Sequence, residues 1–417
     1  MPLYAVMCYV GSLHHQLPKR RDLEQLALQR LQPDQSSLCD VGSKGLYQVA
    51  ALLLLAIVSY GQSELGKASD LLERAISLSV DIGMNRVDLV ESLHDRELGE
   101  LWKRTYWYLY IVESAVAGTE GEFRFEPTST FPLPCEKDGS QQITLAQFDT
   151  ADFEDDFHVF SSLTYLIALV RIGRSIRRLC ERSKDHPTRT VVWADALLMN
   201  WKLHLPSDKQ QVFTENGEID DVMFQAHILF HSLCIHVHTS LADKAGGSNG
   251  LLHRRRKLEA AEGAVSLLTL HPCLVQMSPL NITPLSGIAM SNICASLVIE
   301  PDSQTRDNLR LILGVFKQLG ETWKAAKQEA QTLKAMARLS YSELSNPPQE
   351  ILVGPQIIPK DTLDRGTSCL FPDIISPVQD SDLGSTPPDA RCSSLTMPFS
   401  ENVTGSSADA YIFSWDF

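Results

Sequence analysis

The feature that most constrains the fold is the stretch from Ala50 to Val87, which predicts two helices folded against each other around a short turn. Apolar residues recur there every three or four positions, which is the period of a helix and not the alternation of a strand. They are Leu53, Leu54, Ile57 and Val58 before Gly61, and Ala68, Leu71, Leu72, Ala75, Ile76 and Ile82 after it. Both helices are too hydrophobic to stand alone, so we expect further helices to cover them.

Local signals predict where several helices begin and end. Ser63 is expected to cap the second helix of the hairpin with its hydroxyl, and Gly83 to end it in the left-handed conformation. Asp95 is expected to cap the long helix that follows. Other helices are expected within residues 3–31 as two short pieces, then over Asp156–Cys180, Val191–His204, Asp220–Leu241, His253–Leu270, Thr283–Ile299 and Arg306–Leu339. Strand signals are confined to short pieces such as Phe123–Leu133, so the sequence predicts an all-α, multi-helix body over residues 1–340.

Charge and cysteine spacing exclude several classes of protein. The 417 residues carry a formal net charge of −14, which opposes unaided binding to nucleic acid. The nine cysteines are never closer than 21 residues, so neighbours in sequence form neither a redox pair nor a zinc cluster. The apolar opening lacks the basic region of a signal peptide, and the run Val49–Val58 is about half of the ~20 residues of a membrane span. We expect a nuclear or partly cytoplasmic protein with no cofactor and no membrane contact.

Residues 341–417 differ in composition from the rest of the chain. They hold 9 prolines, 11 acidic side chains and only 3 basic ones, a net charge of −8. Such a composition predicts a disordered acidic tail. At its end, aromatic residues are interspersed with acids, a pattern typical of activation segments that bind a coactivator. The candidate activation residues are Tyr411, Phe413, Trp415 and Phe417.

Three basic clusters each have two interpretations. Lys19, Arg20 and Arg21 form one run, and Arg254, Arg255, Arg256 and Lys257 form another. Both are candidate nuclear import signals, although a solvated helix start beside acidic residues is the interpretation we favour. A third set, Arg171, Arg174 and Arg178, recurs at helical spacing and is expected to form an exposed, solvated face; a phosphate-binding stripe is the alternative.

No constellation of residues points to catalysis. His227, His231, Cys234 and His238 share one helix face, but four ligands strung over three turns cannot surround one metal ion, so we expect them to pack in the core. Gly61–Gly66 lacks the spacing and the preceding strand of a nucleophile elbow, and Gly246–Gly250 is expected to be a flexible connection. The sequence therefore predicts a protein that is not an enzyme.

Several motifs, in order and spacing, resemble a known family. AISLSVDIGMNR is followed by GELWKRTYWYLYIVESAVAG and then FEPTSTFPLPC, while VVWADALLMNWKLHLP and FQAHILFHSLCIHVHTSL come later. This arrangement is similar to the middle homology region of the fungal zinc binuclear cluster transcription factors, over roughly residues 3–340. The chain departs from the family at Glu113-Ser114 and Gly118–Gly121, where the family has an aspartate and a glycine-arginine-proline turn. It also lacks the family's six-cysteine cluster that reads DNA.

The resemblance implies a transcription regulator of a fungal pathway or secondary-metabolite gene cluster, with a helical body that inhibits the protein or senses an effector. Its expected partners are the transcription machinery or a coactivator and another transcription factor as dimer partner. DNA contact would be indirect or through an N-terminal zinc domain, the only place where zinc is expected. The alternative function is a helical adaptor, because the hairpin resembles one tetratricopeptide unit. No second copy appears at the repeat period, and such solenoids need several.

Overall fold

The computed structural model describes residues 2–15, 18–31, 43–117, 121–135, 143–150, 160–182, 187–214, 216–244, 247–298, 303–345 and 412–413. The chain divides into one unit of residues 1–352 with 411–415 and a second of residues 353–410 with 416–417. All described residues belong to the first unit, the body. The predicted disordered tail, residues 341–417, begins too early, because residues 341–345 are the end of helix α14 (Lys324–Ser345). The rest of it lies outside the described residues, except for the backbone of 412–413.

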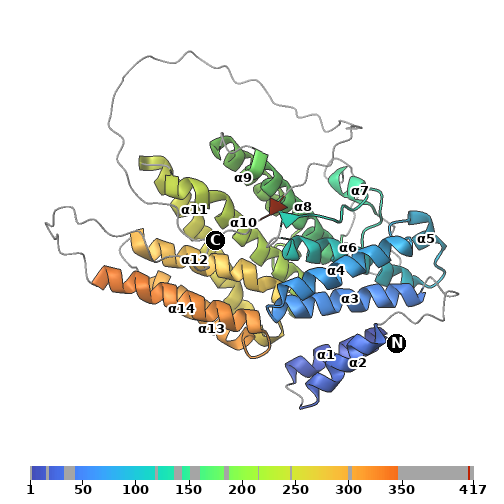
Figure 1. The fold of residues 1–417 in the computed structure, drawn as a ribbon. Coiled ribbons are helices and arrows are strands. Elements are labelled where there is room, and N and C mark those ends of the chain that lie inside the picture. Colours follow the sequence, from blue (N-terminus) through green and yellow to red (C-terminus); the bar gives the residue numbers. More distant parts are fainter. Residues whose placement is uncertain are drawn as a thin grey trace, which may run out of the picture. The chain divides into compact units, whose positions relative to one another are not determined.

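Helices dominate the described part of the body (Figure 1). The α-helices are α1 (Pro2–His14), α2 (Arg20–Arg30), α3 (Ser43–Gly61), α4 (Leu65–Asp81), α5 (Val87–Ser92), α6 (Arg96–Val116), α7 (Leu145–Thr150), α8 (Ser162–Arg182), α9 (Pro187–Leu203), α10 (Asp221–Lys244), α11 (Gly247–Leu270), α12 (Ile282–Val298), α13 (Ser303–Leu319) and α14 (Lys324–Ser345). Two 3₁₀ turns, η2 (Leu274–Gln276) and η3 (Pro279–Asn281), precede α12. The all-α prediction is confirmed. The described strands are the two-residue β1 (Gly121–Glu122) and β2 (Ile412–Phe413), which pair antiparallel.

The hairpin of α3 and α4 is confirmed, but its turn differs from the prediction. Gly83 has φ of +68°, and the N–H of Met84 donates to Ser79 O at 2.7 Å, so the left-handed ending of α4 is confirmed. Ser63 makes no cap for α4 with its side chain. It has φ of +62° and ends α3 instead, where the N–H of Glu64 donates to Ser59 O at 2.8 Å. The same left-handed motif thus closes both helices, and the predicted Ser63 cap is wrong.

Helix α6 is the centre of the aromatic core. Asp95 caps it as predicted, accepting from the N–H groups of Glu97 at 3.0 Å and Leu98 at 3.2 Å. The extended segment after it lies on its aromatic residues: Tyr106 stacks on Phe131 with ring centroids 3.9 Å apart. Trp107 donates to Pro132 O at 2.9 Å. The predicted strand Phe123–Leu133 is therefore extended chain with one bridge, between Pro132 and Thr144, and the strand β1 directly precedes it.

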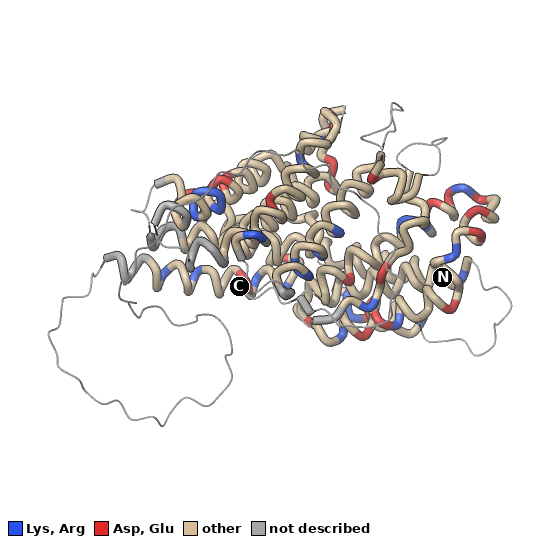
Figure 2. The backbone as a smooth tube through the Cα atoms, turned by 90° about the horizontal axis from the view of Figure 1, so that it is seen from above, with Lys and Arg blue, Asp and Glu red and all other residues tan. Residues whose placement is uncertain are grey.

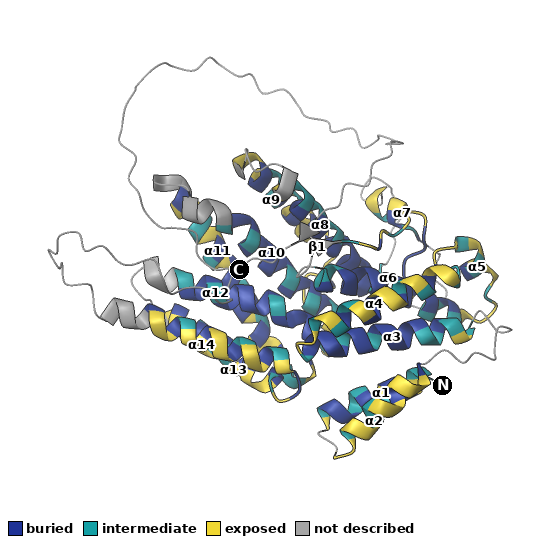
Figure 3. Cartoon of the chain, in the orientation of Figure 1, coloured by how far each residue is buried: buried dark blue, intermediate teal, exposed yellow. Residues whose placement is uncertain are grey.

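Helix α10 packs against α8, α9, α11 and α12. Figure 3 shows buried residues along α3, α6 and α12, and exposed residues along the outer faces of α4, α13 and α14. Helix α3 is long and apolar enough to cross a membrane by length and composition. However, 67% of its most apolar window is buried within the body, which is also what a core helix shows.

Two predicted segments are corrected by the structure. The expected single helix Arg306–Leu339 is divided into α13 and α14, because the chain turns at Gly320 and Trp323 then packs back against Gly61 at the end of α3. Gln62 supports this contact by donating to Thr322 O at 3.0 Å. The predicted flexible connection Gly246–Gly250 is helical from Gly247 onward, as the first turn of α11.

Candidate functional site

A buried ion pair joins α6 to α8 at the position where the chain departs from the family pattern. Arg174 Nη2 lies 2.7 Å from Glu113 Oε2, and both side chains are at most 3% exposed. Glu113 Oε1 also accepts from the backbone N–H of Phe125 at 2.8 Å and from that of Arg124. The carboxylate therefore fixes the start of the extended segment as well as α8.

The Arg174 guanidinium makes four hydrogen bonds within the protein, one of them to Glu113. Its Nε donates to Ser114 Oγ at 2.7 Å, Nη1 to Phe125 O at 2.9 Å and Nη2 to Tyr110 O at 3.0 Å. Its central carbon lies 3.9 Å from the ring centroids of both Tyr110 and Phe123. A buried charge is tolerated only when it is paired and hydrogen-bonded in this way. Nη1 also lies 3.6 Å from Glu126 Oε1, so the guanidinium is committed to contacts that hold α6, α8 and the extended segment together.

Burial raises the pKa of the Glu113 carboxyl, and the charge of Arg174 and the N–H groups of residues 124 and 125 oppose that rise. The prediction that Arg174 faces solvent is wrong. Helical spacing placed it beside Arg171 and Arg178, but the buried carboxylate of α6 draws it inward. Arg171 instead pairs with Asp149 at the edge of the body, and Arg178 pairs with Glu126. A charged residue within the apolar run Ile111–Val116 was the sequence signal for this site.

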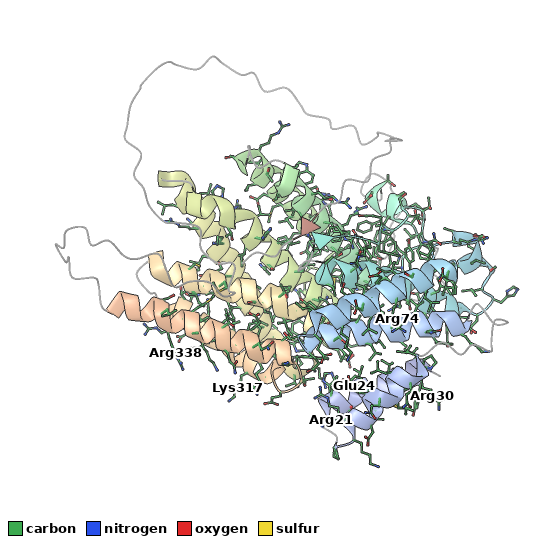
Figure 4. All side chains as sticks on the ribbon, viewed as in Figure 1. Arg21, Glu24, Arg30, Arg74, Lys317 and Arg338 are labelled. Carbon is green, nitrogen blue, oxygen red and sulfur yellow. The ribbon has the colours of Figure 1, made fainter. Side chains whose placement is uncertain are left out.

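Of the two predicted basic runs, the first lies at a helix start, as expected, whereas the second lies inside α11, which begins seven residues earlier at Gly247. Lys19 precedes α2, and Arg20 and Arg21 are its first residues, with Lys19 and Arg21 exposed; Figure 4 labels Arg21. Within α11, Arg255 pairs with Glu259 at 3.0 Å while Lys257 is only 9% exposed. Figure 2 shows acidic residues interspersed with basic ones over the described helices. The import role of Lys19, Arg20, Arg21 and of Arg254, Arg255, Arg256, Lys257 stays a prediction.

The histidine and cysteine face of α10 is packed in the core. His227, His231, Cys234 and His238 are all buried. His227 Nε2 lies 3.0 Å from Lys209 O, and His238 contacts Asp195 at 3.1 Å and His253 at 3.0 Å. Among the described residues, no group of three histidine, cysteine or acidic side chains is arranged to hold a metal ion. Packing between α10 and its neighbours therefore accounts for this face.

His231 gives the body a predicted sensitivity to acid. Burial, with smaller effects of Lys202 and His227, lowers the pKa of His231 to about 3. Between pH 6.5 and 3, the unfolded chain binds a proton that the folded body does not, so stability falls as pH falls. From pH 7 to pH 5 we expect His231 to contribute a loss of about 2 kcal/mol in the unfolding free energy, measured by urea denaturation followed by circular dichroism.

The matched variant is His231→Leu, which should reduce the pH dependence. Burial also lowers the pKa of His227 and His236, so part of the dependence should remain. An unaltered slope in His231→Leu would contradict the assignment.

The structure describes little of the predicted activation segment. Phe413 lies in β2, and its backbone pairs with Gly121. Tyr411, Trp415 and Phe417 lie outside the described residues. The activation role of the four aromatic residues is therefore untested by the structure.

Comparison with known proteins gives two findings. The model of the fungal specific transcription factor domain matches residues 1–211. The chain is also 25% identical over 370 residues to the C6 finger domain transcription factor iacK of Pestalotiopsis fici (strain W106-1 / CGMCC3.15140). That alignment covers 81% of this chain and 54% of the relative, so the chain spans about half the length of the curated relative it matches. No solved structure matches the chain.

The findings confirm the resemblance seen in the sequence motifs. They favour a fungal transcription regulator over the helical adaptor. The only sequence feature that supported an adaptor was the single hairpin that resembles a tetratricopeptide unit. The matched domain begins at α1 and extends past α9, and it contains the hairpin, the aromatic helix α6 and the Glu113–Arg174 pair. Because the match covers half of the chain, the protein belongs to the fungal specific transcription factor domain family.

Proposed function

We propose that this chain is the regulatory body and activating tail of a fungal transcription regulator that acts in the nucleus. The match of the family domain to residues 1–211 carries the proposal, and the similarity to a C6 finger domain transcription factor supports it. The regulated genes are those of a fungal pathway or secondary-metabolite cluster, as the resemblance to the family implies. The body supplies no catalytic step in this proposal, because the buried cluster around Glu113 and Arg174 uses its hydrogen bonds to hold the helices together.

Contact with DNA is assigned to another domain or another chain. The nine cysteines are at least 21 residues apart, so neighbouring cysteines do not form a six-cysteine cluster, and the net charge of −14 opposes binding to phosphates. We propose that DNA is reached through an N-terminal zinc domain outside this sequence or through a second transcription factor as dimer partner. The chain itself then requires no cofactor, and its partners are a coactivator or the transcription machinery.

The tail provides the direct test of this function. Fused to an unrelated DNA-binding domain, residues 341–417 should activate a reporter gene, because an acidic chain keeps its aromatic side chains solvated until a coactivator groove buries them. Each buried ring contributes on the order of 1 to 3 kcal/mol to binding. Replacing Tyr411, Phe413, Trp415 and Phe417 together with alanine should therefore abolish activation.

The matched control separates aromatic from acidic contributions. Asp409→Asn with Asp416→Asn should only weaken the reporter signal, because charge mainly steers association. Western blotting of each fusion ensures equal amounts. A silent wild-type fusion, or full activity in the variant with four alanines, would refute the activating role of the tail.

A further inference from the structure

A cavity of about 60 Å³ lies where α3, α6, α8, α10 and the start of α12 meet. Its wall is mostly apolar and includes Ile111, Val170, Leu229 and Leu233. The cavity is partly open to solvent. Protein interiors are packed to the density of organic crystals. A cavity at the junction of five helices is therefore a candidate binding site for a small molecule.

One polar group in this wall has no protein partner. Asn281 is 3% exposed, and its Oδ1 accepts no hydrogen bond from any described residue. Its neighbours are satisfied: Tyr60 Oη and Thr283 Oγ1 hydrogen-bond to each other at 2.5 Å. A buried acceptor without a donor costs free energy. Because this oxygen is itself buried, the Asn281 side chain has to rotate toward the cavity before a ligand can supply that donor.

The charges around the cavity favour a neutral ligand. Arg174 lines the wall, but its guanidinium already binds Glu113, Tyr110 O and Phe125 O. An anion would compete with a buried carboxylate that lies 2.7 Å from the guanidinium. The lining contains no carboxylate that would attract a cation. The remaining polar groups are neutral: the Ser114 hydroxyl, which donates to Tyr110 O and accepts from Arg174 Nε, and the half-buried amide of Gln225.

We infer that this cavity binds a small, neutral, mostly apolar molecule that carries one hydroxyl or N–H donor for Asn281 Oδ1. An apolar cavity of roughly 150 Å³ holds benzene, so a cavity of about 60 Å³ encloses only a few heavy atoms and the rest of the ligand extends toward solvent. The claim that the pocket is the effector site of a transcription regulator rests on the function proposed above. The claim that the pocket binds a small molecule does not.

The test uses two fluorinated probes of equal size, 4-fluorophenol and 4-fluorotoluene, titrated into the full chain and followed by ¹⁹F NMR. They differ in a hydroxyl against a methyl group. The phenol should bind about tenfold more tightly, because it alone donates to Asn281 Oδ1. Asn281→Leu keeps the volume of the side chain and removes the acceptor, so it should bring the two affinities together.

A second pair of variants locates the site. Ala115→Leu on α6 fills the cavity and should abolish binding of both probes, with circular dichroism confirming that the variant is folded. Leu229→Phe on α10 fills it from another helix and replaces Ala115→Leu if that variant does not fold. Absence of phenol binding at millimolar concentration, equal affinities for the two probes, or binding retained in a filled variant would overturn the inference. None of these results depends on reporter activity. The hypothesis of a binding pocket and the hypothesis of an activating tail are therefore tested separately.

Discussion

Replacing Arg174 with alanine should lower the unfolding free energy of the body by about 3 to 5 kcal/mol, because it leaves the Glu113 carboxylate buried without its cation. Glu113→Ala should cost a similar amount, since the guanidinium is then the uncompensated charge. The pair is nearly excluded from solvent, and its partners include the backbone of Phe125 and Tyr110, so little relaxation is available. Urea denaturation followed by circular dichroism measures the loss.

Two comparisons show whether burial is the cause. Arg178→Ala removes an ion pair whose side chains are 36% and 53% exposed, and it should cost less than about 1 kcal/mol. The double variant Glu113→Leu with Arg174→Met removes both charges and should recover part of the loss. Recovery is incomplete because the backbone groups of residues 110, 124 and 125 lose their partners. A loss below 1 kcal/mol for Arg174→Ala would contradict the structural role of the pair.

Trp323→Ala is expected to destabilise the body by about 3 to 5 kcal/mol, since it empties a large buried volume. Trp323 is 3% exposed, lies edge-on to His14 with ring centroids 5.6 Å apart and covers the end of α3. A Cβ atom added at Gly61 would lie 2.6 Å from Trp323 Cε3 and 2.8 Å from Pro279 Cβ. Gly61→Ala should therefore cost about 1 to 3 kcal/mol by overpacking.

A double-mutant cycle makes this contact measurable. Gly61→Ala should cost less in the Trp323→Ala background than in the wild type, because the ring that it meets is gone, although Pro279 remains. Trp193→Ala, at a half-buried tryptophan of α9, serves as the matched control with a smaller loss. Additive effects of Gly61→Ala and Trp323→Ala in urea denaturation would show that the two residues are not coupled.

Features governed by a few neighbouring residues could be predicted from the sequence. The Asp95 cap and the left-handed Gly83 both depend on hydrogen bonds within five residues, and both are confirmed. The prediction of a Ser63 cap was wrong because only Gln62, Ser63 and Glu64 separate α3 from α4. In so short a turn, closing the first helix and capping the second compete for the same residues, and the backbone bonds that end α3 prevail.

Features that depend on distant residues could not be predicted. Helical spacing puts Arg174 on one face of α8, but it does not say that a carboxylate 61 residues earlier faces it. The division of α13 from α14 has both a local and a distant part. Gly320 at the turn is a local signal, since a Cβ atom there would lie 3.0 Å from Phe316 O and 3.2 Å from Lys327 Cα, whereas the packing of Trp323 against Gly61 depends on a residue far away in the sequence. The unpartnered Asn281 in the cavity wall is equally a product of packing between helices far apart in sequence.

The contact between the ends of α3 and α13 has a consequence for synthesis of the protein. Gln62 and Thr322 are 260 residues apart, so a ribosome adding about 5 to 20 residues per second needs roughly 10 to 50 s to make the second after the first. During that interval the apolar end of α3 has emerged without the tryptophan that covers it. The nascent chain therefore exposes this hydrophobic surface for the whole of that interval, and the contact can form only after α13 has been made.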